Sequence, residues 1–282
     1  MEPLSRRNVL VGAGGLALAG VVFARPLIGE HRVEQQLRSR MTSFSFGDYV
    51  TQGLVSLEDN APPPVIRLRQ GQRAILDFTN GLEGYSTIHW HGIRLPNVMD
   101  DVPYLTQFPV AQNETFRYEF TPPDVGTYWY QPHCMTMDQM ALGLTGVLMV
   151  DEEDAPGFDA DIALNPKGFQ LDADGSLLNF FTPRGAARGG TLGNVQTSNW
   201  KQDSVYDVPA GGIIRLRFVV TDTTSIHKLV FPEVAGQIIA WDGHPVDEAI
   251  LWPTMDNPLL LAPGQRVDVE RHASPFPQTD LA

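Results

Sequence analysis

The sequence predicts an all-β fold of two tandem Greek-key β-sandwiches, and three of its features support this class. Short apolar runs alternate with polar residues, a period of two that is typical of half-buried strands. The 26 glycines and 22 prolines lie mainly between these runs, which indicates strands joined by turns. Two such series of strands are separated by an acidic run at residues 151–154, so we expect two domains.

The first domain is expected to cover residues 25–155. Residues 25–60 show little periodicity and are expected to be a weakly patterned lead-in that wraps this domain. Strands are predicted over the ranges 65–69, 74–79, 116–120 and 143–150. The acidic run that closes the unit, with Ala155-Pro156-Gly157 after it, is expected to be a solvated hinge.

The second domain is expected to cover residues 156–270. Its strands are predicted at 162–164, 214–218 and 267–269, with a glycine-rich loop over 185–193. Residues 271–282 are expected to form an irregular tail, because Pro275 and Pro277 cannot lie in a central strand. This abrupt change leads to the hypothesis of a gene truncated or frame-shifted within the second domain.

The N-terminal segment resembles an export signal. Paired arginines, Arg6 and Arg7, precede an apolar stretch from Val9 to Ala24, and such a pair is typical of the twin-arginine route. The stretch is shorter than the roughly 20 apolar residues that a membrane span needs. We therefore expect residues 1–24 to be removed as a twin-arginine signal peptide, which leaves no membrane span and makes the mature protein periplasmic.

The composition argues against some classes of partner and bond. The formal net charge is −13, and an acidic surface repels a polyanion, so no nucleic-acid partner is expected. Cys134 is the only cysteine, which rules out an internal disulfide in an oxidising compartment. The sequence gives no indication of oligomeric state.

The arrangement of histidines suits a metal site. His89 and His91 lie two residues apart, so on a strand their side chains point the same way, with backbones about 6.5–7 Å apart. Gln131 and His133 repeat this spacing, and a second strand beside the first would place all four side chains around one cavity. Neutral imidazole suits copper, whereas a carboxamide is a weak ligand for it. The pattern predicts a site for neighbouring metal ions, with Gln131 as its doubtful position.

Three segments resemble the first domain of multicopper oxidases. They are His89-Trp90-His91-Gly92, the stretch from Pro96 to Gln107 that contains Asp100, and the segment from Gly126 to His133. Softer matches to the second domain of the family lie at residues 208–212, 242–246 and 261–269. The resemblance implies two tandem cupredoxin-like domains of laccase type.

The resemblance also implies how copper would be held. Enzymes of this family bind three coppers between their first and third domains and feed them electrons from a type 1 copper in the third. By position, His89 would bind the type 2 copper, His91 one type 3 copper and His133 the other. Gln131 stands where the family has a second first-domain ligand for the copper that His91 binds.

Two adjacent acidic residues lie in the matched stretch, of which one agrees with the family and one departs from it. Asp100 matches the acid that passes protons to reduced oxygen in the family, a role that a carboxylate on a chain of hydrogen bonds can fill. Asp101 replaces the glycine that usually follows it, at a turn where the conformational freedom of glycine is normally used.

The complementary half of the cluster is not found in this sequence. The other histidines of the mature chain stand outside any His-X-His pair; they are His31, His227, His244 and His272. A type 1 site needs a thiolate with two histidines, and Cys134 has no histidine shortly after it. We therefore expect a trinuclear half site without type 1 copper and without a C-terminal type 1 copper domain. A second copy of the chain would bring the same half again.

The resemblance implies a laccase-like oxidoreductase with copper ions and dioxygen as partners. The family reaction is the one-electron oxidation of phenols or metal ions coupled to reduction of dioxygen to water, and it is expected to be incomplete in this chain alone. Whether the chain is an enzyme is therefore left open. The alternative is a non-catalytic periplasmic protein of the same fold, for copper binding or for envelope or cell-division assembly.

A soft-ligand cluster gives a weaker hypothesis. Soft side chains that suit cuprous ion lie close together in one segment, at His133, Cys134, Met135, Met137 and Met140. Methionine and cysteine more commonly fill apolar gaps, which is the favoured interpretation. His227 and His244 are expected at the surface and in a turn, as non-ligands.

Overall fold

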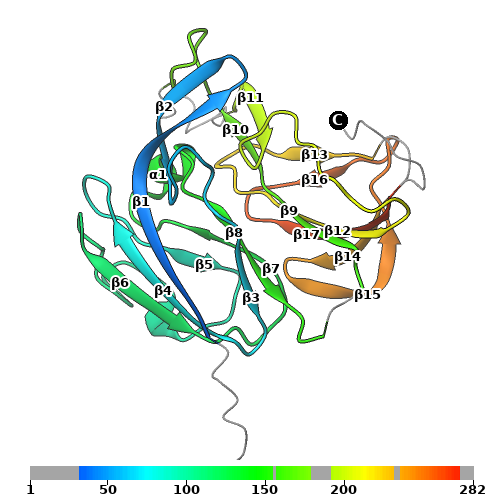
Figure 1. Ribbon diagram of the computed structural model, residues 1–282, viewed down its shortest axis with the longest axis horizontal. Helices are drawn as coiled ribbons and strands as arrows, with labels where there is room; N and C mark the ends of the chain where they lie inside the picture. The colour runs from blue at the N-terminus through cyan, green and yellow to red at the C-terminus, as the bar shows by residue number, and fades with distance from the viewer. Residues whose placement is uncertain (1–31, 155–156, 179–191, 232–235, 274–282) are drawn as a thin grey trace, which may run out of the picture. The chain divides into compact units, whose positions relative to one another are not determined.

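The computed structural model describes residues 32–154, 157–178, 192–231 and 236–273. These residues form an almost entirely β structure, in which β1–β8 build one sandwich and most later strands build another (Figure 1). The expected signal peptide, most of the expected glycine-rich loop and residues 274–282 of the expected tail lie outside the described residues. The predicted all-β class is confirmed.

One sheet of the first sandwich has the order β2-β1-β4-β6. Its strands are β1 (Arg32–Phe46), β2 (Tyr49–Ser56), β4 (Arg73–Asn80) and β6 (Thr115–Phe120). Strand β1 runs parallel to β4 and antiparallel to β2. The expectation that residues 25–60 are a weakly patterned lead-in was therefore wrong for its described part, since β1 is the longest strand of this sheet. Its exposed polar positions obscured the period in the sequence.

The other sheet of this sandwich has the order β3-β8-β7-β5. Its strands are β3 (Ile66–Arg69), β8 (Gly146–Asp151), β7 (Gly126–Gln131) and β5 (His89–His91). Apolar side chains from both sheets fill the space between them; Trp90, for example, packs on Tyr118 with ring centroids 5.4 Å apart. The short helices η1 (Asn97–Met99) and α1 (Thr136–Ala141) lie in the loops that follow β5 and β7.

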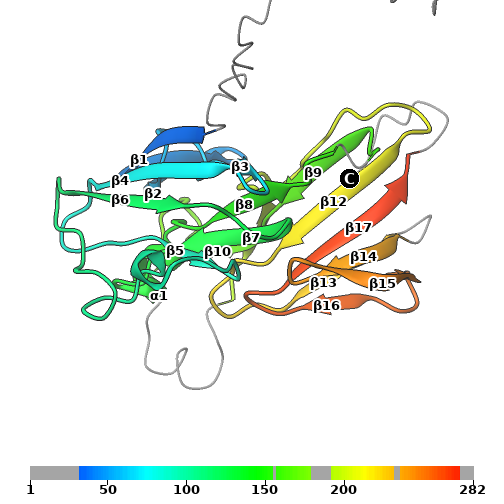
Figure 2. The ribbon, with the colours of Figure 1, turned by 90° about the horizontal axis from the view of Figure 1, so that it is seen from below.

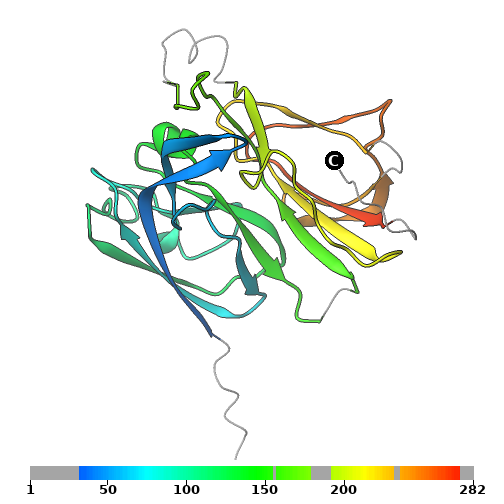
Figure 3. The same ribbon diagram turned by 45° about the horizontal axis from the view of Figure 1, so that its top comes forward.

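The second sandwich is built on a five-stranded sheet of order β15-β14-β17-β12-β9. Its strands are β9 (Ala160–Leu164), β12 (Ile213–Val219), β14 (Gln237–Trp241), β15 (His244–Leu251) and β17 (Arg266–His272), the later ones coloured yellow to red in Figure 3. Two strand pairs accompany this sheet: β13 (His227–Leu229) with β16 (Leu259–Leu261), and β10 (Pro166–Phe169) with β11 (Val195–Ser198). Buried residues such as Ile238, Leu261 and Val269 form its core.

Strand β7 of the first sandwich lies beside β12 and β17 of the second (Figure 2). The side-chain oxygen of Thr127 on β7 is 2.6 Å from a carboxylate oxygen of Asp268 on β17 and 3.0 Å from Nη1 of Arg217 on β12. All three side chains are buried. A buried polar contact therefore joins the two sandwiches at β7, the strand that ends at Gln131.

Two expectations at the domain ends need correction. The first half of the acidic run is not a solvated hinge. Asp151 pairs with Arg67 and Arg217, and Glu152 lies 2.6 Å from Nη1 of the buried Arg215. Strand β17 continues through His272, two residues into the segment expected to be an irregular tail. Within the described ranges, no helix has the length and hydropathy needed to cross a membrane.

Candidate metal centre

Strands β5 and β7 position the candidate ligands. They pair antiparallel, with His89 opposite Gln131 and His91 opposite Trp129. Because neighbouring residues of a strand face opposite ways, the fully buried Trp90 enters the core while His89 and His91 lie on the other face, partly exposed. Strand β7 ends at Gln131, so His133 lies in the bend after it rather than on the strand that the repeated spacing predicted.

The structure nevertheless brings the three histidine rings together. The rings of His89 and His133 are stacked, with centroids 4.1 Å apart and planes inclined by 17°. The ring of His91 is 5.7 Å from that of His89 and nearly perpendicular to it. His91 also stacks on Trp129, at 4.6 Å and 29°. The predicted grouping of His89, His91 and His133 is thus present in the fold.

Backbone carbonyls fix two of these rings. Nδ1 of His89 lies 2.9 Å from the carbonyl oxygen of Asp100, and Nδ1 of His133 lies 2.6 Å from that of Asp101. A carbonyl oxygen can only accept, so each Nδ1 donates this hydrogen bond, and in the neutral ring Nε2 is the nitrogen with a lone pair. This is the second-sphere arrangement by which metal-binding histidines are usually oriented.

The same environment disfavours protonation of the rings. Burial lowers the pKa of His89, with a smaller contribution from the neighbouring His133. Burial also lowers the pKa of His91 to about 4, and the nearby guanidinium of Arg266 adds to this. At neutral pH both imidazoles therefore offer an unprotonated nitrogen to a cation.

The ring geometry favours separate metal positions over one shared ion. Lone pairs of imidazole lie in the ring plane, and the planes of His89 and His133 are stacked with an inclination of only 17°, so the two rings do not share one nearby ion position. In agreement, no three His, Cys, Asp or Glu side chains of the described residues converge on a single ion position.

Asp100 and Asp101 have different surroundings although they are adjacent. The Asp100 side chain is half-exposed, and its Oδ1 is 3.6 Å from Nδ1 of His89. Asp101 is fully buried, adopts a φ of 59° and has no well-formed hydrogen bond to either carboxylate oxygen. Burial raises the pKa of Asp101 to about 8, partly offset by the hydroxyl of Thr87. The left-handed backbone at Asp101 agrees with the expectation that this turn favours glycine.

The soft side chains near His133 are divided among different environments. Met140 is buried in an apolar cluster with Trp129, whereas Met135 and Met137 are exposed. Burial raises the pKa of the half-buried Cys134, which disfavours the thiolate form that binds metals. This distribution favours the interpretation that these residues mainly pack.

The remaining described histidines lie outside this group. His244 and His272 are exposed at strand ends. His227, expected at the surface, is instead half-buried, with Nε2 3.3 Å from a carboxylate oxygen of Asp222.

One contributor that the sequence analysis missed is Arg266, which lies close enough to His91 to lower its pKa. It belongs to the segment 261–269, whose likeness to the family was noted without a role for the arginine.

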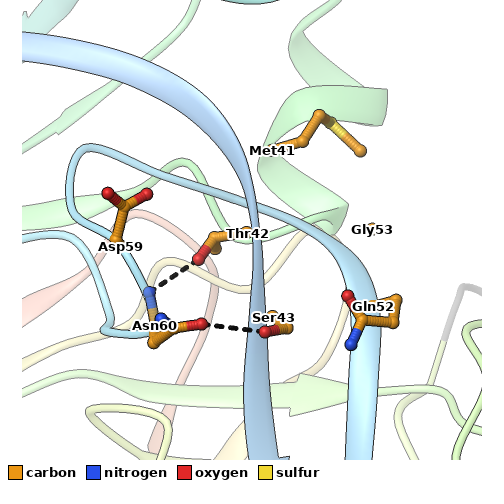
Figure 4. Close-up of a pocket in the computed structure, with 7 residues that line it drawn as sticks. All are labelled: Met41, Thr42, Ser43, Gln52, Gly53, Asp59 and Asn60. Carbon is orange, nitrogen blue, oxygen red and sulfur yellow. Dashed lines mark hydrogen bonds between the residues drawn. The ribbon is translucent and has the colours of Figure 1, made fainter.

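A shallow surface pocket lies elsewhere in the fold and holds none of the candidate ligands (Figure 4). It has a volume of about 320 Å³ and is lined by Met41, Thr42, Ser43, Gln52, Gly53, Asp59 and Asn60. Asn60 closes it through hydrogen bonds of 2.7 Å with Thr42 and 2.8 Å with Ser43. Its lining offers no group of convergent ligands, so the histidines are the stronger candidate.

Known proteins resemble the chain in both sequence and fold. The family model for multicopper oxidases matches residues 39–155. The iron transport multicopper oxidase FET3 of Candida albicans is 34% identical over 142 residues, 47% of this chain and 22% of that protein. Laccase-2 of Botryotinia fuckeliana is 28% identical over 244 residues, 79% of this chain and 40% of that protein.

A solved multi-copper oxidase from Pseudomonas thermotolerans superposes with a TM-score of 0.80 at 34% identity. The match covers 87% of this chain and 59% of that one. The chain therefore spans less than two thirds of the length of each of these relatives.

Proposed function

We infer that this chain, which belongs to the multicopper oxidase family, holds copper ions at His89, His91 and His133 as one half of a copper cluster. The observation that carries the proposal is the stacked pair His89 and His133. Backbone carbonyls hold both Nδ1 atoms, so Nε2 is the nitrogen that each neutral ring offers to a metal, and the two rings lie in stacked planes. By position in the family, His89 serves the type 2 copper, and His91 and His133 serve the two type 3 coppers.

The donor set fits copper. Neutral imidazole is a good ligand for cupric ion, and the lowered pKa values of His89 and His91 keep both rings neutral. Gln131, opposite His89, offers only a carboxamide, so the copper served by His91 has weaker support from this chain. When bound, copper would supply the one-electron steps that link oxidation of a phenol or metal ion to reduction of dioxygen.

The proposed task of Asp100 is to move protons. Its half-exposed carboxyl lies near His89 and reaches solvent, so it can take protons from water and pass them toward the site. Its backbone carbonyl meanwhile orients His89.

The remaining ligands are proposed to come from outside these 282 residues, whether from further sequence or from another chain. Each histidine of the group serves its own ion, and every ion needs further donors. A type 1 copper needs a thiolate and two histidines, and the described residues place no such set around Cys134. We propose that electrons enter through a type 1 copper supplied in the same way.

The cellular setting is proposed from the sequence. Residues 1–24 act as a twin-arginine signal, and the mature protein works in the periplasm with domains at 25–155 and 156–270. Export of the folded protein would agree with a cofactor inserted before transport.

Copper analysis tests the function. The purified protein is incubated with cupric ion, dialysed and measured for copper content and electron paramagnetic resonance. We expect bound copper with nitrogen hyperfine splitting, lost in the variant H89A/H91A/H133A and retained in H244A, which removes an exposed histidine. Equal copper in the triple variant and the parent protein would refute the proposal.

An oxygen-uptake assay separates the alternatives. Bound copper without oxygen uptake in the presence of a phenol favours the non-catalytic copper-binding protein. Absence of copper favours the role in envelope or cell-division assembly. An intense blue absorption band would contradict the proposed external origin of type 1 copper.

A further inference from the structure

Arg266 is a buried cation of the second sandwich whose guanidinium is fixed on three sides. Its Nε donates to the carbonyl oxygen of Thr127 at 3.2 Å, on β7 of the first sandwich. Its two terminal nitrogens donate to the carbonyl oxygens of Gly264 at 3.1 Å and Asp242 at 2.7 Å. Only 5% of the residue is exposed. These bonds leave the planar group little freedom to rotate.

The fixed guanidinium lies against the residue that follows His91. A Cβ atom added at Gly92 would stand 2.5 Å from Nη2 of Arg266, and Gly92 has a φ of 85°. Both facts require glycine at this position. The backbone that leaves the ligand strand β5 is therefore in close contact with the second sandwich.

The same arginine holds a turn beside the His91 ring. Its bonded partner Gly264 is so close that a Cβ there would lie 3.9 Å from Cε1 and Nε2 of His91, and 4.0 Å from Trp129. Trp129 in turn stacks on His91. His91 thus stacks on one residue of its own sandwich, and a turn of the other sandwich lies beside its ring.

His91 differs from the other two ligands in its support. Carbonyl oxygens fix the rings of His89 and His133, whereas within the described ranges no hydrogen bond does this for the His91 ring. Its orientation therefore depends on packing. The packing partners on one side are held in place by Arg266.

We propose that Arg266 is a positioning residue, through which the second sandwich holds His91 in the orientation that binds copper. The proposal rests on the proposed copper-binding function. It assigns the second sandwich a direct part in forming the site, although the three ligands all come from the first.

The test uses the full chain with R266M, R266K and a matched control, R215M. Arg215 is an equally buried arginine of the same five-stranded sheet, and it bonds to Glu152 and Asp161 rather than to residues near His91. R266K keeps the charge but not the planar fork, so it serves if R266M does not fold.

The first readout needs no copper. Histidines of the metal-free protein are modified with diethyl pyrocarbonate and mapped by mass spectrometry. We expect His91 to react at least about fivefold faster in R266M and R266K, a change that corresponds to loss of roughly 1 kcal/mol of packing, with His89 and His133 unchanged. The R215M control should leave His91 at its original rate even if the protein is less stable.

The second readout is the electron paramagnetic resonance spectrum of bound cupric ion, which should change in R266M and R266K but not in R215M. Unaltered His91 reactivity in both Arg266 variants would overturn the positioning role. Copper retained by the triple histidine variant would overturn the proposed function alone, because the modification readout does not depend on metal.

Discussion

At the scale of single residues, the rings of His89 and His133 are hydrogen-bonded, whereas the carboxyl of the neighbouring Asp101 makes no well-formed hydrogen bond. His89 and His133 each donate a hydrogen bond from Nδ1 to a backbone carbonyl oxygen. This bond satisfies both the ring N–H and the carbonyl, which would cost stability if they were buried without a partner. Asp101 supplies one of those carbonyls, yet its own carboxyl is buried without a well-formed hydrogen bond. The backbone at this turn therefore supports the site while the side chain costs stability.

Replacement of Asp101 by glycine is expected to stabilise the protein. The change removes a buried, poorly bonded carboxyl and relaxes a φ of 59°. We expect a gain of about 1–3 kcal/mol at pH 8, the typical cost of an unsatisfied buried polar group. Urea denaturation of the two proteins measures it. D101N is the matched control, since it removes the charge and keeps a side chain at this φ.

The gain from D101G should depend on pH. The folded-state pKa of Asp101 is about 8, against an ordinary value of 3.8, so between these values the folded state binds more protons than the unfolded state. Stability contributed by this group therefore falls as pH rises through the window. The gain should be smaller near pH 4, where only the relief of the backbone and of the buried neutral carboxyl remains, and largest near pH 8. A gain independent of pH would show that the backbone, not the carboxyl, limits stability.

Replacement of Gln131 by histidine is expected to strengthen copper binding. Gln131 lies opposite His89 at the end of β7 and is partly buried, so an imidazole there joins the existing group. Because imidazole is the better copper ligand, we expect about tenfold tighter binding or additional bound copper by titration calorimetry and metal analysis. Q237H, which adds a histidine at an exposed position of β14, controls for unspecific binding. Unchanged copper content in Q131H would contradict the assignment of this position.

At the scale of elements, charged side chains fix how β9 joins the second sheet. Strand β9 runs parallel to β12, and Asp161 on β9 accepts from Arg215 at 2.7 Å and Arg217 at 2.7 Å. Arg217 is 1% exposed and Arg215 6%, so neither charge can be left alone without a large desolvation cost. The first strand after the interdomain segment is thus tied to the sheet by ion pairs.

D161N should be destabilised, and less so in acid. Burial of Asp161 by itself raises its pKa, but hydrogen bonds and charges of the two arginines outweigh this and hold the pKa at about 2, below the ordinary 3.8. The stability from this depressed carboxyl is present above about pH 4 and is lost as pH falls toward 2. We expect a loss of about 2 kcal/mol at pH 7 by urea denaturation, converging with the parent protein in acid. D59N, in an exposed pair with Arg40, should change stability little.

The elements show what the sequence could predict. Strands β4, β6 and β12 were predicted because apolar and polar residues alternate along them, although the polar residues of β12 are buried as well. Strand β1 was missed, since many of its residues are exposed or half-buried and its pairing with β4 spans distant sequence. Asp151 and Glu152 were taken for a hinge, because a charge run in sequence does not show the arginines it will meet.

The site shows the same division. His89 and His91 were placed correctly on a strand, since their spacing is local. The stacking of His133 on His89 and the approach of Arg266 to Gly92 depend on a bend and on contact between sandwiches, which no local pattern encodes.

At the scale of the whole molecule, the two sandwiches share one compact unit, so their junction should contribute to global stability. Thr127 on β7 is fully buried, lies 2.6 Å from Asp268 on β17 and accepts from Arg217 on β12. The same residue's carbonyl accepts from Arg266. One threonine of the first sandwich therefore contacts two neighbouring strands of the second, β12 and β17.

Replacement of Thr127 by valine is the sharpest test of this coupling. The isosteric change removes a hydroxyl that bonds the buried Asp268 and Arg217 and leaves both short of a partner, so we expect a loss of about 1–3 kcal/mol. T115V is the control, because Thr115 pairs with Thr79 at an exposed site. Calorimetry should show one transition at lower temperature for T127V. Two separate transitions in the parent protein would mean that the sandwiches unfold independently and that the junction does not couple them.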